Sequence, residues 1–314
     1  MTSKVFDIVI HGGDYEHTLG IDGACAGRLR VRYQPMRVQD IFVAMLESRA
    51  FEACEFSLAN YITLRGADQH WLTAVPVFPV RAFRHGLAVT RHDSALTALG
   101  QLAGARIGVE DYSMTAAVWF RGLLQEEYGV DLRSITWVTR TRQRFAFPAG
   151  ARVETTNADL EQLLLDRAID ALLGFALKDS ALPAQERRLR PILADTQAAE
   201  RAYYERTSIY PIMHCVVIRN DTLEKHGEIV DAVCRAYGAA KESAYRRQLG
   251  ATLVPWGKTN WARTFEIFGG DPLPYGLTPI NRMVIERLAL YLKQQGFISE
   301  TPDVEKLFAL PTRL

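Results

Sequence analysis

Arginine and histidine side chains gather in one short stretch, where Arg81, Arg84 and His85 lie between two predicted strands. A guanidinium can hold a carboxylate through two parallel hydrogen bonds, and an imidazole exchanges protons near neutral pH. Loops at strand ends often carry binding and catalytic side chains, so we expect the arginines to bind an anionic ligand and His85 to act as an acid. The alternatives are solvated loop arginines and a histidine bonded to backbone.

Three further candidates lie at predicted strand ends nearer the amino terminus. His11 comes just past the carboxyl end of the first strand, where open α/β sheets place their ligands. Glu55 and Ser57 lie at another strand end, where a carboxyl group can serve as a base and a hydroxyl can donate to a ligand oxygen. The alternative for Glu55 is to pair with an arginine and position it.

A lone histidine, His214, interrupts the apolar stretch Ile212–Ile218. By default such a histidine is a core residue whose ring nitrogens are hydrogen-bonded. Its position beside a predicted hinge favours a functional role, and we keep His214 as a catalytic candidate.

The start of a predicted helix from Met114 to Tyr128 is the best candidate for an anion contact. Tyr112, Ser113, Met114 and Thr115 lie there, where unpaired backbone N–H groups and the helix dipole favour negative charge. Ser113 is predicted to cap the helix. The alternative is that Ser113 is only a cap and Met114 only a core residue.

Familiar cofactor and nucleophile motifs are missing from the sequence. There is no G-x-G-x-x-G after the first strand, and no P-loop, G-x-S-x-G or H-E-x-x-H. Cys25, Cys54, Cys215 and Cys234 form no C-x-x-C pair, which argues against structural zinc and favours reduced thiols. We therefore expect no cofactor and assign no metal ligand, although a divalent metal held by distant residues stays open.

Strand-like and helix-like segments alternate along the 314 residues, which predicts an α/β fold. The length is about twice that of one usual domain, so two core-forming units are expected. We place one lobe at 1–92 and 212–314 and the other at 93–211, with two crossing strands as the hinge. Predicted elements include a strand at Val5–Ile10, a helix from Val38 to Glu47 and a helix at Leu223–Leu249.

Composition limits the partners. The 37 basic and 36 acidic residues leave a formal charge of +1, which gives no electrostatic case for nucleic acid or an anionic membrane. Met1–Lys4 lead directly into the first predicted strand without an apolar leader, and no stretch is long and apolar enough to span a membrane. We expect a cytoplasmic protein without a membrane partner, and the composition allows a homo-oligomer.

Five blocks in order along nearly the whole chain resemble the 4,5-dihydroxyphthalate decarboxylase family. The most specific is GVEDYSMTAAVW, from Gly108 to Trp119, which continues to Val130. The others are Phe51–Leu58, Pro76–His85, Ala202–His214 and Asp271–Gly276.

The resemblance implies a two-lobed type II periplasmic-binding-protein-like fold, with two mixed sheets flanked by helices, a hinge and an interlobe cleft. It also implies a carboxy-lyase of aromatic catabolism that converts 4,5-dihydroxyphthalate to protocatechuate without oxidation. His85, Glu55 and His214 are then the catalytic candidates. The residues predicted to bind the small aromatic carboxylate are His11, Ser57, Arg81, Arg84, Tyr112, Ser113, Met114 and Thr115.

Two segments depart from the family pattern and bear on the substrate. The short basic run Arg140–Arg144 replaces a longer glycine-containing loop, and Gly174–Lys178 replaces a proline-rich turn. The alternative functions are therefore a solute-binding protein for an aromatic carboxylate and a different lyase on the same fold.

Overall fold

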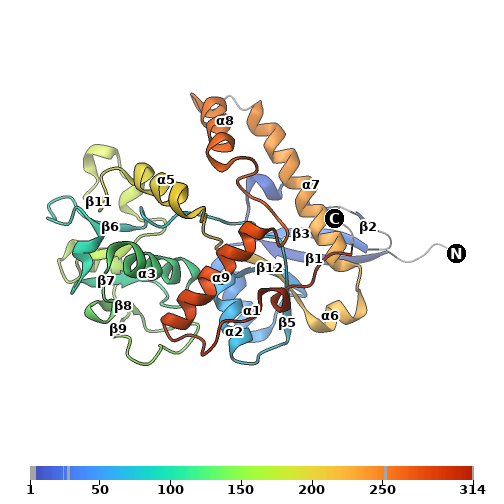
Figure 1. The fold of residues 1–314 in the computed structure, drawn as a ribbon, viewed down its shortest axis with the longest axis horizontal. Helices are drawn as coiled ribbons and strands as arrows, with labels where there is room; N and C mark the ends of the chain where they lie inside the picture. Colours follow the sequence, from blue (N-terminus) through green and yellow to red (C-terminus); the bar gives the residue numbers. More distant parts are fainter. Residues whose placement is uncertain (1–4, 24, 27–28, 251–252, 313–314) are drawn as a thin grey trace. The chain divides into compact units, whose positions relative to one another are not determined.

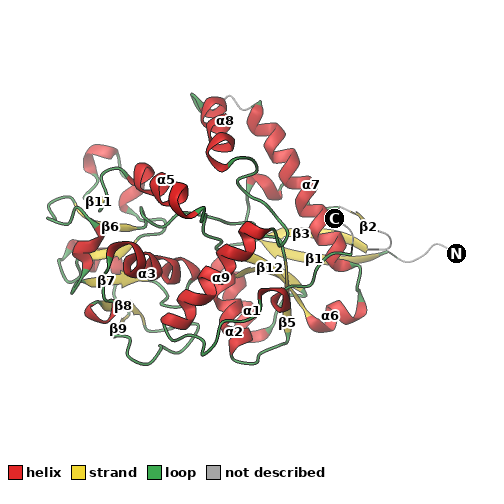
Figure 2. Cartoon of the chain, viewed as in Figure 1, coloured by secondary structure: helices red, strands yellow, loops and turns green. Residues whose placement is uncertain are grey.

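The computed structural model describes residues 5–23, 25–26, 29–250 and 253–312. The chain forms two compact units. The first comprises Met1–Arg81, Ile212–Ile285 and Pro302–Leu314, and the second comprises Ala82–Pro211 and Glu286–Thr301. Within the described residues, each unit has one six-stranded mixed sheet with helices packed on it (Figures 1 and 2).

The first unit holds the two ends of the chain and the strand that returns to it. Its strands are β1 (Phe6–Gly12), β2 (Cys25–Ala26), β3 (Leu29–Pro35), β4 (Ala53–Ser57), β5 (Leu72–Val75) and β12 (His214–Arg219). Its helices are α1 (Val38–Ser48), α2 (Leu58–Gly66), α6 (Asn220–Lys225), α7 (Ile229–Leu249) and α8 (Gly257–Phe268).

Strand direction in the first sheet brings distant residues to one edge. The order is β2-β3-β1-β4-β12-β5, with β1 parallel to β3 and β4, and β12 antiparallel to β4 and β5. The carboxyl ends of β1 and β4 therefore lie beside the amino end of β12. The register pairs His214 with Ser57 and Val216 with Glu55.

The alternation of apolar residues explains the core of this unit. Ile8 and Ile10 on β1 are 2% and 0% exposed, and they share a core cluster with Val233 and Tyr237 of α7. Full burial of one such aliphatic side chain contributes about 1.5–3 kcal/mol. In Figure 1, α7 runs beside β1 and β3, and it covers the face of the sheet that carries these residues.

The helix predicted from Leu223 to Leu249 is two helices. The first, α6, ends at Lys225, and α7 begins at Ile229. His226 between them has a non-helical conformation (φ −138°, ψ 71°), which interrupts the helical hydrogen bonds. The polar stretch between Leu223 and Ile229, with Gly227 in it, was included in one helix by the prediction, and the structure divides it.

The second unit has its own sheet, in the order β11-β6-β10-β7-β8-β9. The central strand β7 is parallel to β8 and β10, whereas β6 is antiparallel to β10 and β11. Its elements are β6 (Ala88–Arg91), β7 (Arg106–Val109), β8 (Thr136–Arg140), β9 (Val153–Thr156), β10 (Ala171–Leu173), β11 (Leu189–Pro191), α3 (Thr115–Tyr128), α4 (Leu160–Leu165) and α5 (Thr196–Thr207).

The division between the units differs from the lobe boundaries expected at 92/93. Strand β6 pairs with β10 and β11, so the chain enters the second unit at Ala82. Helix α9 (Pro279–Gln294) begins in the first unit and ends in the second, because its last turns pack on α3. There the Tyr291 ring lies 5.4 Å from that of Trp119, and it fills the space beside Gly122.

No helix in the described ranges has the length and apolar character needed to cross a membrane.

Candidate functional site

A buried carboxylate lies at the carboxyl edge of the first sheet. Glu55 sits on β4, a strand with five buried residues, and its side chain is 0% exposed. Its Oε2 accepts a hydrogen bond from the backbone N–H of Gly13 at 2.8 Å. Its Oε1 accepts from the Tyr15 hydroxyl at 2.9 Å and contacts Nδ1 of His214 at 2.5 Å. Such a buried carboxylate is compatible with folding because these donors replace its water shell.

The loop after β1 is built to close on this carboxylate. A Cβ atom on Gly13 would lie 2.2 Å from Cζ of Tyr15, and one on Gly12 would lie 2.3 Å from the Tyr33 hydroxyl, so both positions require glycine. The Tyr33 hydroxyl donates to the Gly13 carbonyl at 2.7 Å, and the Thr18 hydroxyl donates to the Tyr15 carbonyl at 2.9 Å. The loop therefore holds the N–H of Gly13 and the hydroxyl of Tyr15 in place.

His214 is the member of the pair that reaches outward. Its side chain is 17% exposed, whereas that of Glu55 is 0% exposed. The contact with Glu55 uses Nδ1, which leaves Nε2 as the ring nitrogen available to a ligand. The ring packs edge-on against Phe42, with centroids 5.1 Å apart. A carboxylate at one imidazole nitrogen with the other nitrogen open is suited to proton exchange with a ligand.

Tyrosines surround the carboxylate and stay neutral. Burial first, and the Glu55 carboxylate second, raise the pKa of Tyr15 well above its usual value. Burial and Glu55 also raise the pKa values of Tyr33, Tyr237 and Tyr275. These phenols therefore stay neutral throughout the physiological pH range, and two of them are hydrogen-bond donors: Tyr15 to Glu55 and Tyr33 to the Gly13 carbonyl.

His17 completes the loop beside Tyr15. The two rings are stacked, with centroids 5.2 Å apart and an interplanar angle of 3°, and His17 Nε2 lies 2.8 Å from the Pro79 carbonyl. Burial lowers the pKa of His17, so its ring is neutral at neutral pH. Gly13, Tyr15 and His17 were not among the residues predicted from the sequence, because an irregular loop carries no periodic signal.

The other predicted residues of the first unit make different contacts. Ser57 caps α2, with its hydroxyl 3.4 Å from the backbone N of Asn60. The His11 ring stacks on Phe51 at 4.1 Å, and burial lowers the pKa of His11. The role of both in substrate binding stays a prediction.

Arg81 is buried and ties the carboxyl-terminal part of the first unit to the sheet. Its guanidinium donates to the Pro274 carbonyl at 3.1 Å and to the side chain of Asn281, and it lies 5.7 Å from the Phe78 ring centre. In these contacts Arg81 holds protein groups together. Its predicted contact with a ligand carboxylate stays a prediction.

Arg84 and His85 belong to the second unit. Burial lowers the pKa of Arg84 to about 10, which leaves it charged at neutral pH, and its guanidinium lies 5.7 Å from the Phe175 ring centre. His85 is 3% exposed and packs edge-on against Tyr203. Burial first, and Arg206 second, lower the pKa of His85 to about 4. An imidazole that is neutral at neutral pH has no proton to give as a general acid, so this burial does not favour the catalytic role of His85, which stays a prediction.

The turn before α3 is fixed by one carboxylate. Asp111 Oδ1 accepts from the backbone N–H of Ser113 at 2.9 Å and from its hydroxyl at 2.6 Å, and Oδ2 accepts from the backbone N–H of Arg144 at 3.1 Å. The predicted cap is therefore wrong: Met114 is the N-cap, and Ser113 uses its hydroxyl on Asp111. Thr115 begins the helix and is 3% exposed.

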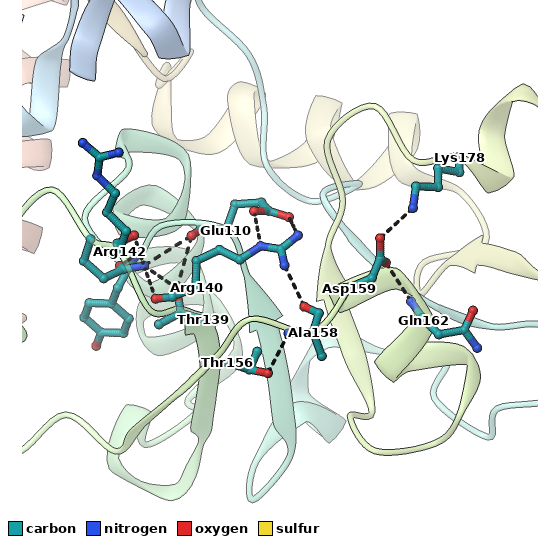
Figure 3. Close-up of polar contacts among 11 residues, drawn as sticks. Glu110, Thr139, Arg140, Arg142, Thr156, Ala158, Asp159, Gln162 and Lys178 are labelled. Carbon is teal, nitrogen blue, oxygen red and sulfur yellow. Dashed lines mark hydrogen bonds and ion pairs between the residues drawn. The ribbon is translucent and has the colours of Figure 1, made fainter. Parts of the chain in front are cut away.

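The basic run after β8 supports the same turn (Figure 3). Arg140 binds both carboxylate oxygens of Glu110, at 2.8 and 3.2 Å, and donates to the Ala158 carbonyl at 2.6 Å. The Gln143 side chain accepts from the backbone N–H of Tyr112 at 2.7 Å and donates to Thr139 at 2.9 Å. Arg140 and Gln143, two residues of the run Arg140–Arg144, therefore help to fix the conformation of the turn before α3.

A buried arginine, Arg121, packs against the Tyr112 ring and hydrogen-bonds its backbone carbonyl. Arg121 is 0% exposed, stacks 3.9 Å from the Tyr112 ring centre and donates to the Tyr112 carbonyl at 2.7 Å. It also donates to Gln295 at 2.7 Å. The start of α3 is thus held by hydrogen bonds and ring packing, and its contact with a ligand anion stays a prediction.

Comparisons with known proteins decide the family. No protein-family profile matches the chain. A 4,5-dihydroxyphthalate decarboxylase of Comamonas testosteroni is 31% identical over 286 residues, which cover 86% of each chain. The chain belongs to the 4,5-dihydroxyphthalate decarboxylase family. A family member of the same name from Pseudomonas putida is 34% identical over 146 residues, covering 43% of this chain and 57% of that protein.

Solved structures confirm the fold. The alkanesulfonate-binding protein SsuA of Xanthomonas axonopodis aligns with a TM-score of 0.60 at 12% identity, over 98% of this chain and 100% of that chain. The periplasmic SsuA of Escherichia coli gives 0.57 at 13% identity, over 98% and 93%. The desulfurization enzyme DszB gives 0.53 at 15% identity, over 97% of each chain. The decarboxylase family member therefore has the periplasmic-binding-protein-like fold that the sequence predicted.

Proposed function

We propose that this chain decarboxylates 4,5-dihydroxyphthalate to protocatechuate without oxidation, with His214 as the proton-transfer group and Glu55 as the carboxylate that supports it. The observation that carries the assignment of residues is the contact of the buried Glu55 with Nδ1 of His214 at 2.5 Å. Membership of a decarboxylase family supports a carboxy-lyase and disfavours the alternative of a solute-binding protein.

The reaction replaces one carboxylate of the ring by a proton. A hydroxyl para to that carboxylate pushes electron density onto the carbon that bears it, and an acid protonates this carbon. Carbon dioxide then leaves with its C–C bonding electrons returning to the ring, which becomes aromatic again. One proton is consumed for each carbon dioxide released, so the protein must orient the substrate and supply an acid.

His214 is suited to supply this acid. With a proton on Nε2 the ring is an imidazolium, and the Glu55 carboxylate at Nδ1 stabilises its charge and orientation. Glu55 itself is fully buried and already binds three donors, so we assign it a role through His214 and not as the direct base that we expected. The start of α3, from Tyr112 to Thr115, remains our proposed contact for a substrate carboxylate.

Turnover tests the proposed function. Metal-stripped protein is incubated anaerobically with 4,5-dihydroxyphthalate, and carbon dioxide and protocatechuate are followed by mass spectrometry. We expect stoichiometric release of both products. Saturable binding of the substrate without any product, also after one repeat with added divalent metal, would contradict the assignment and favour a binding protein or another substrate.

We also propose a cytoplasmic location, which free thiols support, since Cys54, Cys215 and Cys234 form no disulfide with a described residue. Fractionation of cells that express the native gene tests this location. A homo-oligomer stays a prediction, and light scattering of the purified protein tests it.

A further inference from the structure

Two donors share a single oxygen atom of Glu55. The Tyr15 hydroxyl and His214 Nδ1 both contact Oε1, at 2.9 and 2.5 Å, whereas the Gly13 N–H binds Oε2. We propose that Tyr15 is a positioning residue that sets the proton affinity of His214 through this shared oxygen. The proposal rests on the proposed function, because it assigns a purpose to the tuning of His214.

The physical argument concerns the charge left on Oε1. A hydrogen bond from a neutral phenol to a carboxylate oxygen withdraws part of the negative charge that the oxygen offers to a second partner. Because the pKa of Tyr15 is raised by burial and by Glu55, the phenol keeps its proton and is always a donor. Removing it leaves more negative charge for the imidazolium of His214, which becomes harder to deprotonate.

The position of Tyr15 is too well fixed for an incidental contact. Its ring stacks in parallel on His17, whose Nε2 is held by the Pro79 carbonyl. Its backbone N–H donates to the Thr18 hydroxyl at 3.1 Å. These contacts hold the Tyr15 hydroxyl on Oε1 without any contribution from His214.

Other titratable groups near the pair come from several elements and define the controls. They are His17 on the same loop, Tyr33 on β3, Cys54 on β4, Cys215 on β12, Tyr237 and Lys241 on α7, and Tyr275 after α8. Burial raises the pKa of each tyrosine and cysteine and lowers that of His17, so these groups are neutral near pH 7. Lys241 is paired with Asp271 at 2.5 Å. None of them donates to Oε1 among the described contacts.

The test is a titration of His214 by NMR in protein labelled at the histidine rings, with the His214→Gln variant used to assign the signal. We expect Tyr15→Phe to raise the pKa of His214 by about 0.5–1 unit, since a hydrogen bond to a charged group is worth up to a few kcal/mol and only part of it is transmitted. In the profile of kcat against pH, the alkaline limb, which reports loss of the proton from the general acid, should move by the same amount in the same direction.

Tyr33→Phe is the matched control. It removes a phenol hydroxyl that donates to the Gly13 carbonyl and not to the carboxylate. We expect its His214 titration to shift by less than half as much as that of Tyr15→Phe. An equal shift in both variants would overturn the proposal, because it would report a general change of the loop.

A second variant guards against misfolding of Tyr15→Phe. Incorporation of 3-fluorotyrosine at position 15 keeps the ring and makes a stronger donor, so the His214 titration should move to lower pH. No movement in either variant would overturn the proposal. The NMR titration does not require turnover. The role of Tyr15 can therefore be disproved by the titration while the wild-type protein still decarboxylates its substrate. The proposed function fails separately, if the wild-type protein does not turn over.

Discussion

The carboxyl edges of the two sheets use acidic residues in opposite ways. In the first unit, the described residues that bind Glu55 are the neutral donors Gly13 and Tyr15 and the partly exposed His214. In the second unit, Glu110 is paired with Arg140, and Asp111 binds Ser113 and the backbone of Arg144. The first arrangement leaves a group that can exchange a proton, whereas the second leaves a turn with fixed geometry.

This difference separates two tasks that a decarboxylase needs. Proton transfer requires a titratable group with an open nitrogen, and among the candidates predicted from the sequence only His214 has both that nitrogen and a carboxylate partner. Binding requires donors that do not move, and the supports around Tyr112 and Ser113 provide rigidity.

The largest effect is expected from His214→Gln compared with His85→Gln. Loss of a general acid typically costs about 100-fold to 10,000-fold in rate, so kcat should fall by that amount in His214→Gln. His85→Gln should keep a kcat close to wild type, because His85 is neutral and buried. Steady-state kinetics of both purified variants check this, and equal losses would break the comparison.

A smaller effect is expected from Asp111→Asn. The substitution removes the charge and one acceptor from a carboxylate that binds Ser113 and Arg144. We expect KM to rise by roughly 10-fold, about 1.4 kcal/mol, with kcat little changed, since we propose that the turn held by Asp111 binds the substrate and takes no part in proton transfer.

Glu110→Gln is the control for that substitution, because Glu110 forms a partly exposed pair with Arg140 worth about 0.2–1 kcal/mol. Its KM should stay near the wild-type value. A fall of kcat without a change of KM in Asp111→Asn would contradict the division of tasks.

The last effect concerns the pH dependence of stability and not activity. The pKa of His85 is about 4 in the folded chain and about 6.5 when unfolded, so the unfolded state binds the proton first as the pH falls. The free energy of unfolding should therefore decrease between about pH 6.5 and pH 4, by on the order of 2 kcal/mol. His85→Gln should lose this part of the dependence in urea titrations at several pH values. An unchanged pH dependence would show that His85 is not buried as a neutral ring.

Periodicity predicted the regular elements well. The helix expected from Val38 to Glu47 is observed as Val38–Ser48, and the helix expected to stop before Gly129 ends there with Gly129 at φ +64°. The boundary at 92/93 was missed because strand β6 looks the same in sequence whichever sheet it joins. Only its pairing with β10 decides the unit to which it belongs.

The site was predicted only in part, for a physical reason. Glu55 and His214 were both candidates, but they are 159 positions apart, and only the antiparallel pairing of β4 with β12 joins them. Tyr15 was missed because its contact with Glu55 depends on the fold of an irregular loop. Ser113 was misassigned because a capping residue and a residue bonded to Asp111 have the same sequence pattern.

Exchange of a single ring hydrogen tests most directly whether His214 delivers the proton. Decarboxylation places a hydrogen on the carbon that lost carbon dioxide. In the reverse reaction, run with added bicarbonate as the source of carbon dioxide, this carbon is carboxylated first and the same group then removes the hydrogen, so renewed decarboxylation in D₂O leaves deuterium there. Protocatechuate is incubated with enzyme in D₂O, and proton NMR follows the ring position ortho to the carboxylate and para to a hydroxyl. We expect exchange with the wild-type protein and with His85→Gln, but only at the uncatalysed rate with His214→Gln. Exchange by His214→Gln at the wild-type rate would contradict the account.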